Sequence, residues 1–122
     1  MVKFNRIKIS TDATARLKVL KGRTGLTPNI LARIALCYSL NTQRITNIVK
    51  PDEEGQEFNR YTLTGEYDAY FVALVKERCL QDGLDPEKNF IEQFKIHLNN
   101  GIMAIYSRIN DISDLTNLLK GN

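Results

Sequence analysis

Few side chains in this 122-residue sequence have the type and spacing that catalysis requires. The single histidine, His97, directly precedes Leu98 in a helical pattern, where a histidine more often forms structural hydrogen bonds than acts as a general base. The two cysteines, Cys37 and Cys79, lie inside amphipathic patterns and lack the spacing of metal ligands. No glycine-rich phosphate loop, nucleophile elbow or zinc motif is present. We therefore expect no enzymatic activity, no cofactor and no metal site, and we expect both thiols to be reduced and structural.

The acidic residues do not suggest an acid–base pair or a cation site either. Glu66 and Asp68 are two positions apart, so on a helix their carboxylates point to different faces. Residues 51–55, Pro-Asp-Glu-Glu-Gly, lack the alternating ligand spacing of a calcium loop. Proline and glycine at the two ends of this run predict an exposed turn instead.

Basic residues are concentrated in the first half of the chain. Residues 1–50 contain ten lysines and arginines but only one acidic residue, Asp12, which gives a charge of +9. Residues 51–122 contain seven basic and thirteen acidic residues, or −6, and the two parts give the net charge of +3. This asymmetry predicts a face that binds a polyanion, whereas the alternative is a solvated surface with no such role.

Local signals predict the elements that would position this basic half. Residues 4–10 alternate between apolar and basic side chains, as a half-buried strand does. Ser10 or Thr11 can cap a first helix. Gly25 can adopt the left-handed conformation that ends this helix, and the threonine and proline at 27–28 are suited to the N-cap and first position of a second one.

The resulting order of strand, helix, turn and helix is that of a ribbon-helix-helix DNA-binding unit. In such a unit the strand pairs with the strand of a second chain, because one short strand alone leaves its backbone groups unpaired. In the alternative interpretation the strand pairs within its own chain and the charged face is merely solvated. The order of the elements leaves both interpretations open.

If the basic half binds DNA, phosphates are the expected ligands, because lysine and arginine hold the backbone largely without reading sequence. A helix N-terminus would add oriented amides. The expected DNA-contacting residues are Lys3, Arg6, Lys8, Arg16, Lys18, Lys21, Arg23, Thr27, Asn29 and Arg33. Lys18 and Lys21 on the first helix and Lys8 on the strand are the strongest candidates of this set.

The second half of the chain predicts a small helical layer. Residues 42–64 are left undecided, with a short strand around Phe58 as one option. The further expectations are a helix from Gly65 to the stop at Gly83, another that starts at Asp85 and Pro86, an interruption at 99–101, and a last helix capped by Ser113.

The sequence therefore predicts a single, mainly α domain over residues 1–122, with a ribbon-helix-helix-like N-terminal half (a short strand and two helices) packed on a C-terminal helical layer. No apolar run approaches the ~20 residues that span a bilayer, and no signal peptide opens the sequence, so we expect a cytoplasmic protein without a membrane partner. The lone strand and the excess of apolar helix surface predict a homo-oligomer, a tetramer built as a dimer of dimers.

Several stretches resemble the DndE family of DNA sulfur-modification proteins. The first comprises residues 23–37, Arg-Thr-Gly-Leu-Thr-Pro-Asn-Ile-Leu-Ala-Arg-Ile-Ala-Leu-Cys. It is preceded by Arg-Ile-Lys-Ile-Ser at 6–10 and followed by His-Leu-Asn-Asn-Gly-Ile at 97–102, so that the resemblance covers nearly the whole chain.

The resemblance implies a non-enzymatic component of bacterial DNA phosphorothioation, in which sulfur replaces a non-bridging phosphate oxygen. It implies binding to DNA, with affinity for nicked duplex, self-association, and action beside other DNA sulfur-modification subunits. It supplies no catalytic residues. Two alternatives are a ribbon-helix-helix repressor or antitoxin, which would bind an operator selectively, and a nickase, which would need a metal or nucleophile site.

Overall fold

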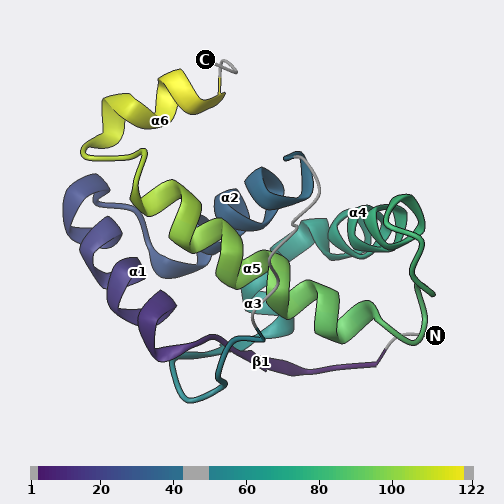
Figure 1. Cartoon of the computed structure of the whole chain (residues 1–122). Coiled ribbons are helices and arrows are strands. Elements are labelled where there is room, and N and C mark those ends of the chain that lie inside the picture. The colour runs from purple at the N-terminus through teal and green to yellow at the C-terminus, as the bar shows by residue number, and fades with distance from the viewer. Residues whose placement is uncertain (1–2, 43–49, 120–122) are drawn as a thin grey trace.

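The expected order of one short strand followed by two helices is present in the computed structural model (Figure 1). The structure describes residues 3–42 and 50–119. The elements are β1 (Arg6–Lys8), α1 (Thr11–Thr24), α2 (Pro28–Leu40), β2 (Glu57–Asn59), α3 (Arg60–Thr64), the 3-10 helix η1 (Gly65–Tyr67), α4 (Asp68–Gln81), α5 (Phe90–Tyr106) and α6 (Ile112–Leu119). The predicted mainly α class, with a strand–helix–helix half packed on further helices, is confirmed. Within the described ranges, no helix has both the length and the apolar character needed to cross a membrane.

The joint between α1 and α2 has the predicted capping interactions. Ser10 is the N-cap of α1, and its Oγ accepts a hydrogen bond from the amide of Ala13 at 3.0 Å. Gly25 ends this helix with φ of 75°, in the left-handed region, and its amide donates to the carbonyl of Lys21 at 2.8 Å. Thr27 is the N-cap of α2, and Pro28 is the first residue of that helix. The tight turn therefore follows from side chains adjacent in sequence.

Strand β1 pairs with β2 of the same chain, as the second of the two interpretations proposed. The strands are antiparallel, with Ile7 opposite Phe58 and with Arg6 and Lys8 opposite Asn59 and Glu57. The apolar pair is buried, whereas the charged side chains point to solvent. A strand from a second chain is not needed to complete this ladder, because residues 57–59 supply the partner that the sequence left undecided.

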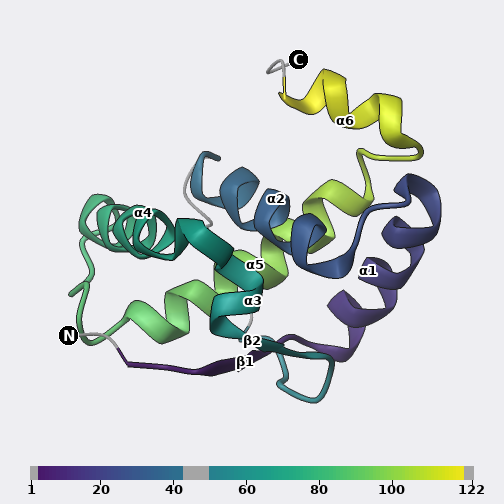
Figure 2. The same ribbon diagram turned by 180° about the vertical axis from the view of Figure 1, so that it is seen from behind.

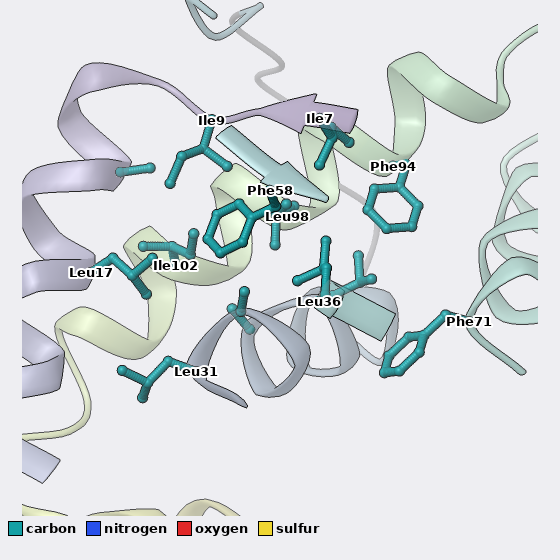
Figure 3. Packing of buried hydrophobic residues seen from close by; sticks show 14 of the residues in the cluster. Ile7, Ile9, Leu17, Leu31, Leu36, Phe58, Phe71, Phe94, Leu98 and Ile102 are labelled. Atoms are coloured by element: carbon teal, nitrogen blue, oxygen red, sulfur yellow. The ribbon is translucent and has the colours of Figure 1, made fainter. Parts of the chain in front are cut away.

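Helix α5 crosses the middle of the molecule, with α1 and α2 packed against it and α4 near its beginning (Figures 1 and 2). Five apolar residues that recur every three or four positions are fully buried, so one continuous stripe faces the core, made of Phe90, Phe94, Leu98, Ile102 and Ile105. In Figure 3, Leu98 and Ile102 of this stripe meet Phe58 of β2, with Leu17 of α1 and Leu36 of α2 in the same cluster. The core thus joins both halves of the chain in one unit.

The predicted interruption at 99–101 is wrong, because α5 runs unbroken through it. A Cβ on Gly101 would lie 1.9 Å from the carbonyl oxygen of Ala35, so glycine is needed for the backbones of α5 and α2 to approach each other. The Oδ1 of Asn99 accepts a hydrogen bond from the amide of Ser10 at 2.8 Å. The residues expected to interrupt the helix therefore connect α5 to its neighbours: Gly101 to α2 and Asn99 to the start of α1.

The start of α5 also differs from the prediction at Asp85 and Pro86. The Asp85 carboxylate accepts hydrogen bonds from the amides of Glu87 and Lys88, at 2.8 and 3.0 Å, but these residues form only an isolated turn. The helix begins at Phe90, whose ring is fully buried. The preceding helix, α4, ends at Gln81, and the predicted glycine stop follows at Gly83 with φ of 73°.

The last helix is capped by a different residue from the one predicted. Asp111 lies just before α6, and its Oδ1 accepts hydrogen bonds from the amides of Ser113 and Asp114, at 2.8 and 3.2 Å. Ser113 is therefore the second residue inside the helix and not its cap. Aspartate and serine are both good N-cap residues, so the local sequence alone does not decide which of Asp111 and Ser113 caps the helix.

Substituting Gly25 with valine is expected to lower the free energy of unfolding by about 1–3 kcal/mol, because a β-branched residue is strained at positive φ. Gly22, also near the end of α1, is the matched control, since a Cβ there meets no atom within 4 Å. Gly22→Ala should stabilise the protein by about 0.5–1 kcal/mol. Denaturant titration measures both values, and equal stabilities for Gly25→Val and the wild type would contradict the assignment.

Candidate nucleic-acid interface

The outward face of α1 carries two lysines that make no ion pair or side-chain hydrogen bond with the described part of the chain. Lys18 and Lys21 are exposed and, three positions apart, project from neighbouring positions on the helix surface. Among residues 3–42 and 50–119, neither makes an ion pair or a side-chain hydrogen bond. Both ammonium groups are therefore available to an anion in solution.

The two arginines of α1 have a different role, because both contact Tyr106 at the end of α5. The guanidinium carbons of Arg16 and Arg23 lie 5.2 and 4.7 Å from the centre of the Tyr106 ring. Arg23 also donates hydrogen bonds from Nη1 to the carbonyls of Tyr106 and Ile109, at 3.2 and 3.3 Å. These arginines hold α1 against α5, so they are less available for DNA than the sequence suggested.

Arg33 of α2 is likewise engaged inside the molecule. Its Nε donates a hydrogen bond to the carbonyl of Leu63, and its Nη2 donates to the carbonyl of Thr62 at 3.1 Å. Both carbonyls lie in the last turn of α3, where a cation interacts favourably with the helix dipole. The side chain thereby joins α2 to α3.

The charges on β1 are partly compensated by acidic neighbours. Nη1 of Arg6 lies 3.6 Å from Oε2 of Glu57, and Lys8 is opposite the same glutamate in the ladder. The pKa of Glu53 is lowered, chiefly by its hydrogen bond with Lys95, and Lys8 contributes through its charge. The strand therefore presents less net positive charge than α1 does.

The N-termini of α1 and α2 differ in how their free amides are used. At α1, the carboxylate of Asp52 accepts hydrogen bonds from the amide and hydroxyl of Thr11, at 3.1 and 3.2 Å. Hydrogen bonds from the amides of Glu54 and Thr11 lower the pKa of this carboxyl group. The first turn of α2 contains no acidic residue; Thr27 is exposed and Asn29 half-buried there. The negative charge of Asp52 would repel an external anion at the N-terminus of α1. The first turn of α2 contains no acidic residue that would do so.

The histidine and the two cysteines lie wholly or partly inside the fold. His97 is buried, and its Nδ1 lies 2.8 Å from the hydroxyl oxygen of Ser39. Burial, with a smaller contribution from the charge of Arg78, lowers the pKa of His97 to about 4. Burial also raises the pKa of the Cys37 and Cys79 thiols. In the described ranges no group of three or more histidine, cysteine or acidic side chains could hold a metal ion.

One feature was not predicted from the sequence: a cleft of about 600 Å³ between the chain leading into β1, α3 and α4. Its lining includes Lys3, Phe4, Arg60, Tyr61, Asp68 and Lys76. Lys3 therefore lies at this cleft and not on the outward face of α1 with Lys18 and Lys21. The adjacent arginine and tyrosine at 60–61 were the only local signal, and nothing in the sequence indicates that β1–β2 pairing brings them beside residue 4.

Comparisons with known proteins agree on one family. The family model described as DNA sulphur modification protein DndE matches residues 6–113. The crystal structure of DndE from Escherichia coli B7A, involved in DNA phosphorothioation modification, is 30% identical with a TM-score of 0.69, over 85% of this chain and 98% of that one. A DndE mutant involved in DNA phosphorothioation is 28% identical with a TM-score of 0.65, over 86% and 99%. A search of curated proteins found no match.

Acidification is expected to destabilise the fold through His97. The folded pKa of about 4 lies below the ordinary value of 6.5, so the unfolded chain binds a proton that the folded chain does not. The stabilisation is complete above the unfolded pKa and is lost as the pH falls toward 4. One proton corresponds to a slope of at most about 1.4 kcal/mol per pH unit. Denaturant titrations across this pH range measure it.

His97→Gln provides the control, because an amide does not titrate. The free energy of unfolding of this variant should change less steeply with pH, by a slope that corresponds to up to one proton over the same range. The contributions of the carboxylates should be unchanged. Parallel profiles would contradict the assignment of the pH dependence to His97.

Proposed function

This chain belongs to the DndE family of DNA sulphur modification proteins, and we propose that it acts as a non-catalytic, DNA-binding component of phosphorothioate modification. It binds the backbone of duplex DNA, nicked duplex included, through the basic face of its N-terminal half. Other DNA sulfur-modification subunits carry out the chemistry, and the protein works with them in the cytoplasm.

The observation that carries this proposal is the pair of uncompensated lysines on α1. Lys18 and Lys21 are exposed, whereas Arg16, Arg23 and Arg33 are engaged with other parts of the fold. Each lysine that neutralises a phosphate releases condensed counterions, which drives binding without reading bases. Lys8 and Arg6 on β1 extend the same basic surface with weaker effect, because Glu57 lies beside them.

The N-terminus of α2 is the second element of the proposed interface. Its first turn lacks an acidic residue, and the helix dipole there favours an anion such as phosphate. Pro28 has no N–H, and the amides of Ile30 and Leu31 donate to Thr27, so the Asn29 amide is the one that would donate to the phosphate. Thr27 and Asn29 at this end would add side-chain hydrogen bonds. Such contacts position the protein on the backbone, which suits a reaction at a backbone phosphate.

The two alternative functions receive less support. A ribbon-helix-helix repressor or antitoxin relies on strand pairing between two chains, whereas β1 pairs here with β2 of its own chain. A nickase would need a metal or nucleophile site, and among the described residues no group of three or more histidine, cysteine or acidic side chains could hold a metal ion.

Replacing Lys18 and Lys21 with alanine is expected to weaken binding to duplex DNA similarly for unrelated sequences. The slope of log K against log salt should fall in magnitude by about two, one for each phosphate contact. Lys8→Ala should change the slope by less, because Glu57 partly compensates its charge. Fluorescence anisotropy with intact and nicked duplexes at several salt concentrations measures these slopes.

Lys88→Ala is the matched control, since Lys88 is exposed but lies in the turn before α5. It removes the same charge per substitution and should leave the affinity and the slope nearly unchanged. Equal effects of Lys88→Ala and Lys18→Ala would show that net charge alone determines binding. An unchanged slope in the double variant would place the DNA interface elsewhere.

The protein is expected to assemble as a homotetramer. Large apolar side chains are exposed on α1, α2, α4 and α6, namely Val19, Ile30, Leu80 and Ile112, and association would cover them. Light scattering at micromolar concentration should therefore give about four times the chain mass of 13.9 kDa. A persistent monomer under these conditions would contradict the expectation.

A further inference from the structure

The cleft beside β1 and α3 contains a partly buried ion pair that fixes one guanidinium in place. Arg60 is 9% exposed, and its Nε and Nη2 each donate a hydrogen bond to an Asp68 oxygen at 2.9 Å. Thr64 donates to the same carboxylate at 2.8 Å. These hydrogen bonds, chiefly those from Arg60, lower the pKa of Asp68. The carboxylate is thus neutralised locally and does not repel an anion in the cleft as a free one would.

The fixed guanidinium in turn orders two aromatic rings. Its central carbon lies 4.6 Å from the ring centre of Phe4 and 5.0 Å from that of Tyr61. Phe4 also packs against Phe90 and Phe94, whose ring centres lie 6.0 and 5.3 Å from its own. Tyr61, by contrast, is 58% exposed. The ring of Phe4 is therefore held against the core, whereas the ring of Tyr61 contacts the guanidinium and is otherwise open to solvent.

Two lysines of the cleft supply positive charge beside this ring. Lys3 is exposed, and Lys76 pairs with Glu87 at 3.1 Å on the surface. A surface ion pair of this kind contributes little, so Lys76 can exchange its partner for a phosphate. The volume of about 600 Å³ lies within the range of small-ligand sites.

We propose that this cleft binds an unpaired nucleotide of a DNA strand, with the base stacked on Tyr61 and the phosphate held by Lys3 and Lys76. Every base has a π-face, so such stacking tolerates any sequence. The inference rests on the proposed DNA-binding function and deepens it, because it adds a contact with a base to the backbone contacts of α1. Helices α1 and α4 lie at opposite ends of the molecule, so the two sites can be tested separately (Figure 2).

The test compares Tyr61→Ala with the wild-type protein on a short fluorescent oligothymidylate and on an intact duplex. Loss of one stacked base should weaken single-strand binding by about tenfold and leave duplex binding unchanged. Tyr61→Phe should bind like the wild type, since it keeps the ring. Tyr70→Ala is the matched control: Tyr70 is 60% exposed, packs against Phe71 and does not line the cleft, so its loss should change neither affinity.

Competition with thymidine monophosphate distinguishes a strand from a free nucleotide as the ligand. The mononucleotide should compete weakly, because only the strand supplies phosphates on both sides of the base; competition as strong as that of the oligonucleotide would overturn the assignment to a strand. Equal single-strand affinity for Tyr61→Ala and wild type, or an equal loss on duplex DNA, would overturn the cleft as a base site. If duplex binding still depends on Lys18 and Lys21 in that case, the proposed function stands and only this inference fails.

Discussion

The close approach of α2 and α5 at Gly101 is the constraint on which the rest of the structure depends. Only a residue without a Cβ lets the two backbones come this near, because the Ala35 carbonyl occupies the space. A polar contact joins the same two helices, since Asn100 donates a hydrogen bond to the Ser39 hydroxyl at 3.1 Å. The neighbouring Asn99 binds the amide of Ser10 at the start of α1. The crossing thus orients α2 and, through the tight turn at Gly25, also α1 with its exposed lysines.

The basic half of the chain contains two populations of cations. The arginines at 16, 23 and 33 bind ring faces and carbonyls within the fold, which suits a planar guanidinium with several donors. Lys18 and Lys21 remain in solvent, which suits a strongly hydrated ammonium. The number of cations in the first half therefore overstates the number of side chains that are free to contact a phosphate directly.

Features encoded by neighbouring residues could be predicted, and those that depend on distant contacts could not. Ser10, Gly25 and Thr27 act on amides within a few positions, so the joint followed from local sequence. The continuity of α5 through Gly101 depends on a helix that lies more than sixty positions earlier. The same holds for the candidate site: exposure of Lys18 follows from helix periodicity, whereas the engagement of Arg23 depends on the position of Tyr106.

The two arginines on Tyr106 also affect the thermodynamics of recognition. They attach α1 to the end of α5, so the position of the helix that carries Lys18 and Lys21 is set before any ligand arrives. Only the lysine side chains, and not the helix, would then lose conformational entropy on meeting phosphates. The molecule in this respect offers a preorganised charge array, in contrast to a flexible basic tail that must order itself on binding.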